Sequence, residues 1–220
     1  MKALSISLPD GATVPALVQT PPDAFAGYVF AHGAGAGMDH PFMAAVADGL
    51  AARQVATLRF QFPFMAKGGK RPDAPKLAQA TVRAAVAEAA RQWPGLPLFA
   101  GGKSFGARMT SQAQAAAPLE GVKGLAFVGF PLHPAGKPGT DRADHLQQVL
   151  VPMLFLQGTR DALADLALLR TTTEGLGRRA ALHLEEGADH AFHVLVRSGR
   201  RDEQVLAALC DRLAAWCRRP

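Results

Sequence analysis

The sequence predicts a single α/β domain in which a mostly parallel β-sheet carries helices on both faces and is preceded by a hairpin. The chain has 220 residues, of which 49% are hydrophobic, so it can bury one sizeable core. Short apolar runs, typical of strands buried on both faces, alternate along it with segments whose apolar side chains recur at helical spacing. Such alternation favours a parallel sheet with helical crossovers. We therefore expect residues 1–220 to form one domain.

The expected hairpin lies at the start of the chain. Leu4, Ile6 and Leu8 alternate with serines, the turn 9–11 (PDG) follows, and residues 14–18 resume the apolar pattern. The later strands are expected at residues 28–31, 55–62, 96–100, 124–130, 151–156 and 180–184.

Helices are expected between and after these strands. The first, over residues 41–53, places Met43, Val46 and Leu50 on one face and follows Asp39, a residue type that caps helices. The others are expected over residues 75–93, 105–117, 162–174 and 202–217.

The charge pattern argues against a nucleic-acid partner. The formal net charge is +6, but the lysines and arginines are scattered and form no continuous stripe with interleaved aromatic residues. We therefore interpret the excess of positive charge as solvated surface.

Cysteine usage and the start of the chain predict a cytoplasmic protein. Residues 1–7 (MKALSIS) lack the apolar stretch of a signal peptide, and no later apolar run approaches membrane-spanning length. Cys210 and Cys217 lie seven positions apart on one expected helix, a rise of about 10 Å that a disulfide cannot bridge. Reduced thiols fit the cytoplasm, and we expect no membrane partner.

A serine flanked by glycines stands where an expected strand meets an expected helix. Residues 102–106 (GKSFG) have the spacing G-x-S-x-G, which arises because the turn around such a nucleophile admits only small residues at its flanks. The turn exposes the Ser104 hydroxyl, and the Phe105 N–H and the positive end of the helix face a developing oxyanion. A Walker A phosphate loop is excluded, because it needs a glycine where the chain has Pro97.

A second glycine-rich stretch, residues 32–37 (HGAGAG), directly follows the first buried strand. Small residues there let backbone N–H groups approach a bound oxygen, and we predict Ala34, with Gly35 next, as the second oxyanion donor. The stretch is not a dinucleotide fingerprint, because Met38 and His40 stand where its last glycine would fall. We expect no cofactor and no metal ion.

An acid and a histidine follow the last two strands. Asp161 comes three residues after the glycine that ends one strand, and His190 lies in residues 186–193 (EGADHAFH) after the next. A histidine can act as a general base near neutral pH, and an aspartate can orient it and stabilise its imidazolium form. The chain order Ser104, Asp161, His190, each at the carboxyl end of a strand, predicts a catalytic triad.

Alternative assignments of the base and the acid are compatible with the sequence. His193 is the second choice for the base, and Asp165, one helical turn beyond Asp161, is an alternative acid. Asp161 also fits the cap of the helix expected over residues 162–174.

The chain resembles the α/β-hydrolase superfamily along nearly its whole length. The resemblance is to the small dienelactone-hydrolase-like branch and to a group of uncharacterised α/β-hydrolase-like proteins. It rests on residues 32–41 (HGAGAGMDHP), 58–63 (LRFQFP), 101–106 (GGKSFG), 130–134 (FPLHP) and 187–192 (GADHAF).

The resemblance implies an α/β-hydrolase fold and a serine mechanism. In that mechanism Ser104 attacks an acyl carbonyl, His190 takes its proton, Asp161 steadies His190, and backbone N–H groups hold the oxyanion. Dienelactone hydrolases carry a cysteine nucleophile, whereas position 104 is serine, so their particular reaction does not transfer.

The expected substrate is a small acyl ester or thioester bound in an open site. Residues 131–142 are too few for a helical cap, so no sizeable cap domain is expected. We predict substrate contacts from Phe64, Phe192 and His133, with His40 as a further neighbour of the site. Further apolar residues in or beside these loops fit either an acyl pocket or ordinary core, namely Phe42, Met43, Phe62 and Leu132. Basic loop residues favour substrates with an anionic group: Lys67, Lys70, Arg71 and Lys137.

Two functions of different classes are compatible with this pattern. One is a serine hydrolase, and the other is a binding or assembly subunit that keeps the fold without turnover. Three triad residues in the expected order favour the hydrolase.

Overall fold

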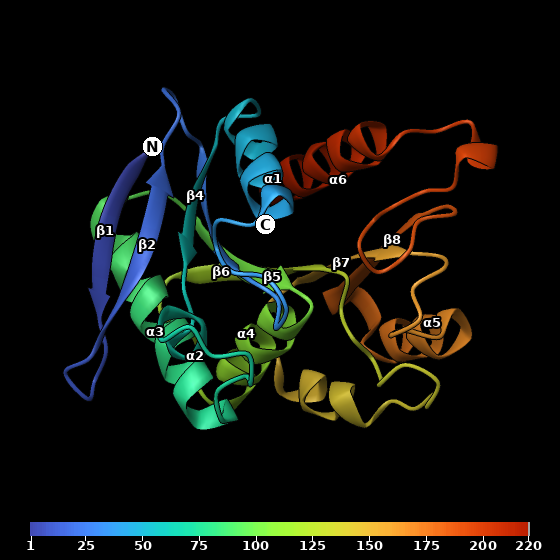
Figure 1. The fold of residues 1–220 in the computed structure, drawn as a ribbon, viewed down its shortest axis with the longest axis horizontal. Coiled ribbons are helices and arrows are strands. Elements are labelled where there is room, and N and C mark those ends of the chain that lie inside the picture. Colours follow the sequence, from blue (N-terminus) through green and yellow to red (C-terminus); the bar gives the residue numbers. More distant parts are fainter. Residues whose placement is uncertain (220) are drawn as a thin grey trace.

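A strongly twisted β-sheet runs through the centre of the protein. The computed structural model describes residues 1–219, and within them eight strands lie in the order β1-β2-β4-β3-β5-β6-β7-β8 (Figure 1). β1 and β2 pair antiparallel and form the predicted hairpin, β2 also pairs antiparallel with β4, and the other pairings are parallel. The strands are β1 (Lys2–Ser7), β2 (Thr13–Gln19), β3 (Ala26–Ala31), β4 (Val55–Phe60), β5 (Leu98–Lys103), β6 (Val122–Val128), β7 (Met153–Gly158) and β8 (Ala180–Glu185).

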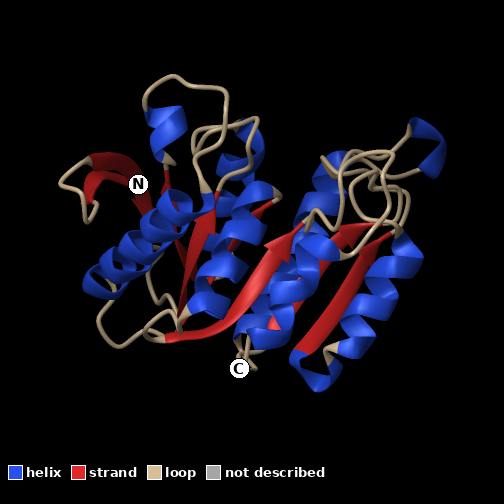
Figure 2. Ribbon diagram, turned by 90° about the horizontal axis from the view of Figure 1, so that it is seen from below, coloured by secondary structure: helices blue, strands red, loops and turns tan. Residues whose placement is uncertain are grey.

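Helices cover both faces of this sheet, as the sequence predicts. α1 (Pro41–Ala51) and α6 (Asp202–Cys217) pack on one face, while α3 (Pro75–Gln92), α4 (Phe105–Ala116) and α5 (Leu166–Gly175) lie on the other (Figure 1). Figure 2 shows the helices and the strands of this arrangement from below. The arrangement confirms the α/β class with its mostly parallel sheet.

The core consists of two apolar clusters, one on each side of the sheet. Successive side chains of a strand point to opposite faces, so Val29 and Ala31 of β3 join one cluster and Tyr28 and Phe30 join the other. The Tyr28 hydroxyl satisfies its hydrogen-bonding needs in the core by donating to the Ala126 carbonyl at 2.8 Å. β3 is therefore buried on both faces, which is the property that its sequence predicts.

β8 differs from the central strands in its burial. The prediction that residues 180–184 are buried on both faces is wrong, because most residues of β8 are only partly buried. β8 lies at the edge of the sheet, where it has a neighbour on one side alone.

Two helix starts also differ from the prediction. Asp39 does not cap α1. The His40 Nδ1 accepts the Phe42 N–H at 3.2 Å, and Pro41 occupies the first turn. α5 begins at Leu166 instead of residue 162, because residues 161–164 form a separate turn and Asp165 provides the cap.

Three short segments had no predicted counterpart near the loops at the carboxyl ends of the strands. They are α2 (Pro63–Ala66) and the 3₁₀ helices η1 (Asp141–Gln148) and η3 (Val196–Ser198). η1 buries only Ala143 and Leu146, so it has too few apolar positions to show a helical period in the sequence. No sizeable cap domain covers this edge of the described chain, as predicted. No helix within residues 1–219 combines the length and the apolar character needed to cross a bilayer.

The contact between η1 and α4 contains a hydrogen bond between half-buried His145 and buried Ser111. His145 Nε2 lies 2.7 Å from the Ser111 hydroxyl oxygen, and burial, with the positive charge of Arg108, lowers the pKa of His145 to about 4. The ordinary histidine pKa is about 6.5, so between these values the unfolded chain binds more protons than the folded one. The contribution of His145 to stability is therefore complete above about pH 6.5 and is lost as the pH falls toward 4.

We expect the urea midpoint of unfolding to fall between about pH 7 and about pH 5, and to fall less in His145→Asn. Exposed His193 is the matched control, because its ion pair with Asp202 raises its pKa and gives it the opposite sign. The urea midpoint of His193→Asn should therefore fall at least as much as that of the wild type between the same pH values. An equal fall of the urea midpoint in the wild type and in His145→Asn would contradict the lowered pKa of His145.

Candidate active site

The predicted serine turn links β5 to α4 and holds Ser104 in a strained conformation. Ser104 has φ 52° and ψ −112°, a region that residues with a side chain rarely occupy. A Cβ at Gly102 would lie 2.5 Å from the Ala31 carbonyl oxygen, and one at Gly106 would overlap the same oxygen and that of His32. The G-x-S-x-G spacing thus has a steric cause, as predicted: only glycine fits at positions 102 and 106.

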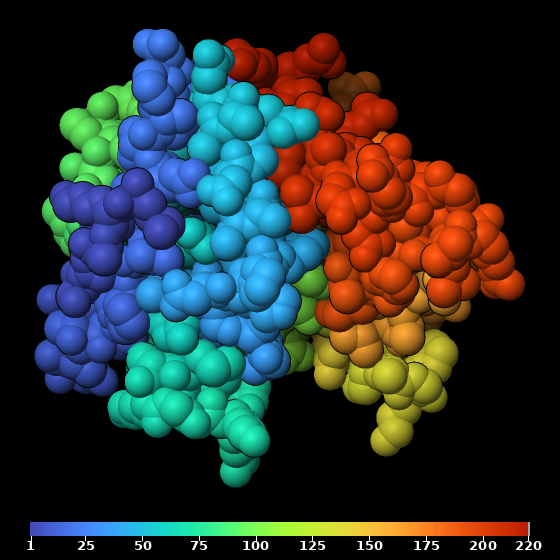
Figure 3. All heavy atoms as spheres, turned by 45° about the horizontal axis from the view of Figure 1, so that its top comes forward, coloured from blue at the N-terminus to red at the C-terminus, as the bar shows by residue number. Residues whose placement is uncertain are grey.

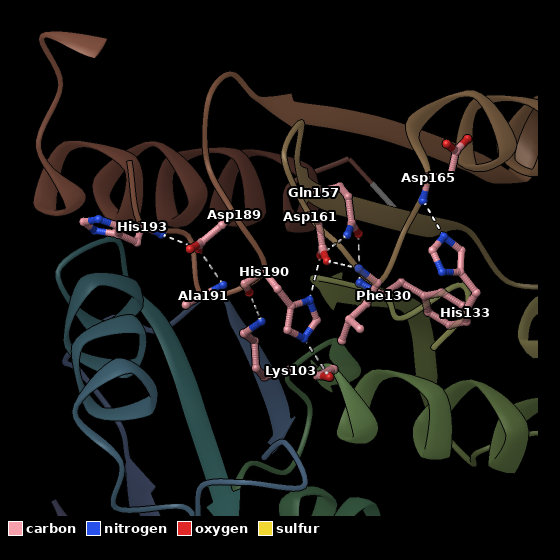
Figure 4. Close-up of polar contacts among 12 residues, drawn as sticks. Lys103, Phe130, His133, Gln157, Asp161, Asp165, Asp189, His190, Ala191 and His193 are labelled. Carbon is pink, nitrogen blue, oxygen red and sulfur yellow. Dashed lines mark hydrogen bonds and ion pairs between the residues drawn. The ribbon is translucent and has the colours of Figure 1, made fainter. Parts of the chain in front are cut away.

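Loops after three strands bring Ser104, His190 and Asp161 together. The Ser104 hydroxyl oxygen lies 2.9 Å from His190 Nε2, and His190 Nδ1 lies 2.7 Å from Asp161 Oδ2 (Figure 4). With the proton on Nδ1, the ring donates to the carboxylate and accepts from the serine hydroxyl. The Asp161 side chain is fully buried, whereas that of His190 is 26% exposed, so the imidazole lies between the protein interior and the cavity.

Gln157, for which no role was predicted from the sequence, binds the aspartate. Gln157 Nε2 donates to Asp161 Oδ2 at 2.5 Å, and its Oε1 accepts the Phe130 N–H at 2.9 Å (Figure 4). The Leu163 N–H donates to the other carboxylate oxygen at 2.8 Å. A polar side chain inside an otherwise apolar strand such as β7 was the available signal for Gln157.

His32 fixes the glycine-rich loop after β3. Its Nδ1 donates to the Gly33 carbonyl at 2.7 Å, and its Nε2 accepts the Phe62 N–H at 2.9 Å. Burial lowers the pKa of His32, which favours the neutral ring that these two bonds require. The residue therefore ties the start of this loop to the chain leaving β4.

A cavity of about 320 Å³ opens beside the Ser104 hydroxyl. Its lining includes the predicted oxyanion loop residues Ala34 and Gly35 on one side and His190 on the other. Figure 3 shows the blue atoms of the segment after β3 facing the orange-red atoms of the last part of the chain, with a strip of green atoms between them. The complete lining is formed by residues 33–36, His40, Phe42, Met43, Lys103, Ser104, Leu163, His190 and Ala191.

The predicted substrate contacts need correction, because all three side chains lie outside this lining. Phe64 is buried in an aromatic cluster 6.2 Å from the Phe105 ring and 5.9 Å from that of His32. Phe192 is buried and stacks on the Phe42 ring at 5.9 Å. Of the other apolar candidates, Phe42 and Met43 line the cavity, whereas Phe62 and Leu132 are fully buried outside the lining.

His133 is bonded to the backbone through both ring nitrogens. Its Nε2 accepts the Asp165 N–H at 2.7 Å, and its Nδ1 donates to the Pro134 carbonyl at 2.8 Å (Figure 4). It therefore anchors the loop before η1 instead of contacting the cavity. Predicted His40 does line the cavity.

The alternative base and acid lie elsewhere. His193 is exposed and pairs with Asp202 at 2.8 Å. Asp165 Oδ1 accepts the Leu168 N–H at 3.0 Å as the cap of α5. The four basic loop residues also lie outside the lining of the cavity, namely Lys67, Lys70, Arg71 and Lys137.

A family model described as an alpha/beta hydrolase domain matches residues 25–218. The chain belongs to the α/β-hydrolase family. The match covers the sheet from β3 onward and every loop that supplies a residue to the cavity.

Solved structures share the fold of this α/β-hydrolase. A serine hydrolase homologue from Coxiella burnetii is 19% identical with a TM-score of 0.78, covering 96% of this chain and 97% of its own. A serine hydrolase without a lid from Xanthomonas campestris is 24% identical with a TM-score of 0.75, over 98% and 94% of the two chains. A dienelactone hydrolase from Anabaena variabilis is 21% identical with a TM-score of 0.76, over 98% and 95%. At these identities the likeness concerns the fold.

We expect Gly106→Ala to lower the free energy of unfolding by about 2 kcal/mol or more, because the new Cβ collides with backbone carbonyl oxygens that cannot move aside. Gly139→Ala is the control, since a Cβ there meets open space and its backbone is not left-handed. Urea unfolding of both variants measures the difference. A Gly106→Ala protein as stable as the control would show that the turn can relax.

Proposed function

We propose that this α/β-hydrolase is a serine hydrolase that cleaves small acyl esters or thioesters through an acyl-enzyme. The observation that carries the proposal is the continuous hydrogen-bonded chain from Ser104 through His190 to buried Asp161, beside a cavity. A nucleophile in hydrogen-bond reach of a base, which a third group orients, is the signature of covalent catalysis.

The proposed first half-reaction acylates the serine. The Ser104 oxygen attacks the substrate carbonyl carbon while His190 Nε2 takes the hydroxyl proton, and Asp161 stabilises the resulting imidazolium. Backbone N–H groups of Phe105 and of Ala34 or Gly35 bind the oxyanion. When the intermediate collapses, the bond to the alcohol or thiol breaks, and His190 returns the proton to this leaving group.

The second half-reaction releases the acid. Water adds to the acyl carbonyl as His190 removes one of its protons, and collapse of this intermediate breaks the bond to Ser104. The serine oxygen regains the proton from His190, which restores the starting state.

The side chains that line the cavity favour substrates with a short or medium apolar acyl group. Phe42, Met43 and Leu163 supply apolar side chains around the serine, and the size of about 320 Å³ suits a small ligand. No sizeable cap covers the described chain, so leaving groups of varied size can extend into solvent.

Names of structural relatives point to the same class of reaction. They include a serine hydrolase without a lid, a dienelactone hydrolase and an esterase domain from Rhodothermus marinus. Position 104 is serine in this chain, which favours esterase chemistry over the thiol chemistry implied for dienelactone hydrolases.

We expect a fluorophosphonate probe to label the wild-type protein and to leave Ser104→Ala unlabelled. The variant should also lower kcat for p-nitrophenyl esters by roughly 10⁶, because the members of such a triad act as a unit. Ser198→Ala, a change in the exposed turn at η3, is the control and should keep wild-type labelling.

The outcome that would overturn the proposal is a correctly folded wild-type protein that is neither labelled nor active on ester or thioester substrates. A binding or assembly subunit would then be the better description.

A further inference from the structure

The ammonium group of Lys103 joins the serine turn to the loop that carries His190. Lys103 directly precedes Ser104, and its Nζ donates a hydrogen bond to the His190 carbonyl oxygen (Figure 4). The same nitrogen lies 5.2 Å from the Phe192 ring centroid and 5.8 Å from that of Phe42, within range of cation–π attraction. One cation thus contacts both the loop after β8 and the start of α1.

Burial of the Lys103 ammonium group carries a desolvation cost. Within residues 1–219 no carboxylate forms an ion pair with Lys103, so a carbonyl dipole and two ring faces replace the water that the ammonium loses. Burial accordingly lowers the pKa of Lys103 to about 8, against the opposing attraction of Asp161 and Asp189. A neutral side chain of similar length would avoid this penalty, which points to a use for the cation.

The His190 loop has its own internal bonds, but these do not place it against the serine. Asp189 Oδ1 accepts the Ala191 N–H at 2.8 Å and the His193 N–H at 2.9 Å, which closes the loop on itself (Figure 4). Phe192 adopts φ 65° within it. The bond from Lys103 is different, because it connects the backbone of the base to the residue next to the nucleophile.

We propose that Lys103 is a positioning residue, whose protonated side chain holds the His190 loop at hydrogen-bonding distance from Ser104. The inference rests on the proposed serine hydrolase function. Its physical basis is that catalysis by a nucleophile and base depends steeply on their separation, so that a misplacement of about 1 Å costs about 10²-fold in rate.

The charge state of Lys103 gives the proposal a distinctive pH dependence. As the pH rises through about 8, the ammonium loses its proton and with it most of its attraction to the carbonyl and the rings. The ionisable groups that face it are Asp161 after β7 and Asp189 and His190 in the loop after β8, whereas α1 presents the apolar Phe42.

The test compares Lys103→Met, Lys103→Arg and the wild type. Lys123→Met, an exposed change in β6, is the matched control. Fluorophosphonate labelling of the wild type comes first, followed by kcat and KM for a p-nitrophenyl ester from about pH 6 to pH 10. Near-UV circular dichroism checks that each variant is folded.

We expect Lys103→Met to lower kcat by about 10- to 10²-fold with KM changed by less than about threefold. Wild-type kcat should decline above about pH 8, and this decline should be absent in Lys103→Arg, whose guanidinium stays charged. Lys123→Met should match the wild type throughout. A residue that only fills space would not make the alkaline decline depend on the choice between lysine and arginine.

Two results would overturn the inference while leaving the proposed function intact. The first is a folded Lys103→Met protein whose kcat equals that of the wild type. The second is a Lys103→Arg protein whose kcat declines above about pH 8 as much as that of the wild type. If Lys103→Met does not fold, the profile of Lys103→Arg decides alone. An unlabelled, inactive wild type would instead reject the proposed function, and the inference would fall with it.

Discussion

Close packing of the serine turn against the end of β3 is the contact on which the site depends. Ala31 and Gly102 are paired in register on neighbouring parallel strands, and the Ala31 carbonyl oxygen lies where any Cβ at Gly102 or Gly106 would be. Because the two backbones approach so closely, Ser104 takes a left-handed conformation that projects its side chain out of the sheet edge. The same approach places the loop after His32 beside the serine, so a single backbone contact sets the positions of the proposed nucleophile and the proposed oxyanion donors.

A network of hydrogen-bonded polar groups links the residues at the ends of β6, β7 and β8 to the serine turn. Gln157 links the backbone at Phe130 to Asp161, and Asp161 links in turn to His190 and the Leu163 N–H. Each member satisfies a group that would be costly to leave unpaired away from water. Such a network has few alternative arrangements, so it favours one tautomer and one orientation of the His190 imidazole.

Aromatic residues divide into a structural group and a group beside the cavity. Phe62, Phe64 and Phe105 pack with His32 behind the serine turn and stiffen it from the side of α3 and α4. Phe42 lies on the other face of the sheet, where it lines the cavity and covers Phe192. The two faces of the sheet therefore differ: side chains on one face support the serine turn, and side chains on the other line the cavity and surround the ammonium group of Lys103.

Much of the architecture follows from local patterns, because apolar periodicity and tight turns depend on neighbours in the chain. The alternation of strands and helices, the hairpin and the turn at Ser104 could be predicted in this way, as could the order in which Asp161 and His190 follow it. The roles of Gln157 and Lys103 could not, and neither could the division of the apolar loop residues into those that line the cavity, such as Phe42, and those buried away from it, such as Phe64. Those depend on which side chains meet when strands far apart in sequence lie side by side. Side-chain direction and long-range contact are properties of the packed sheet, and no spacing along the chain encodes them by itself.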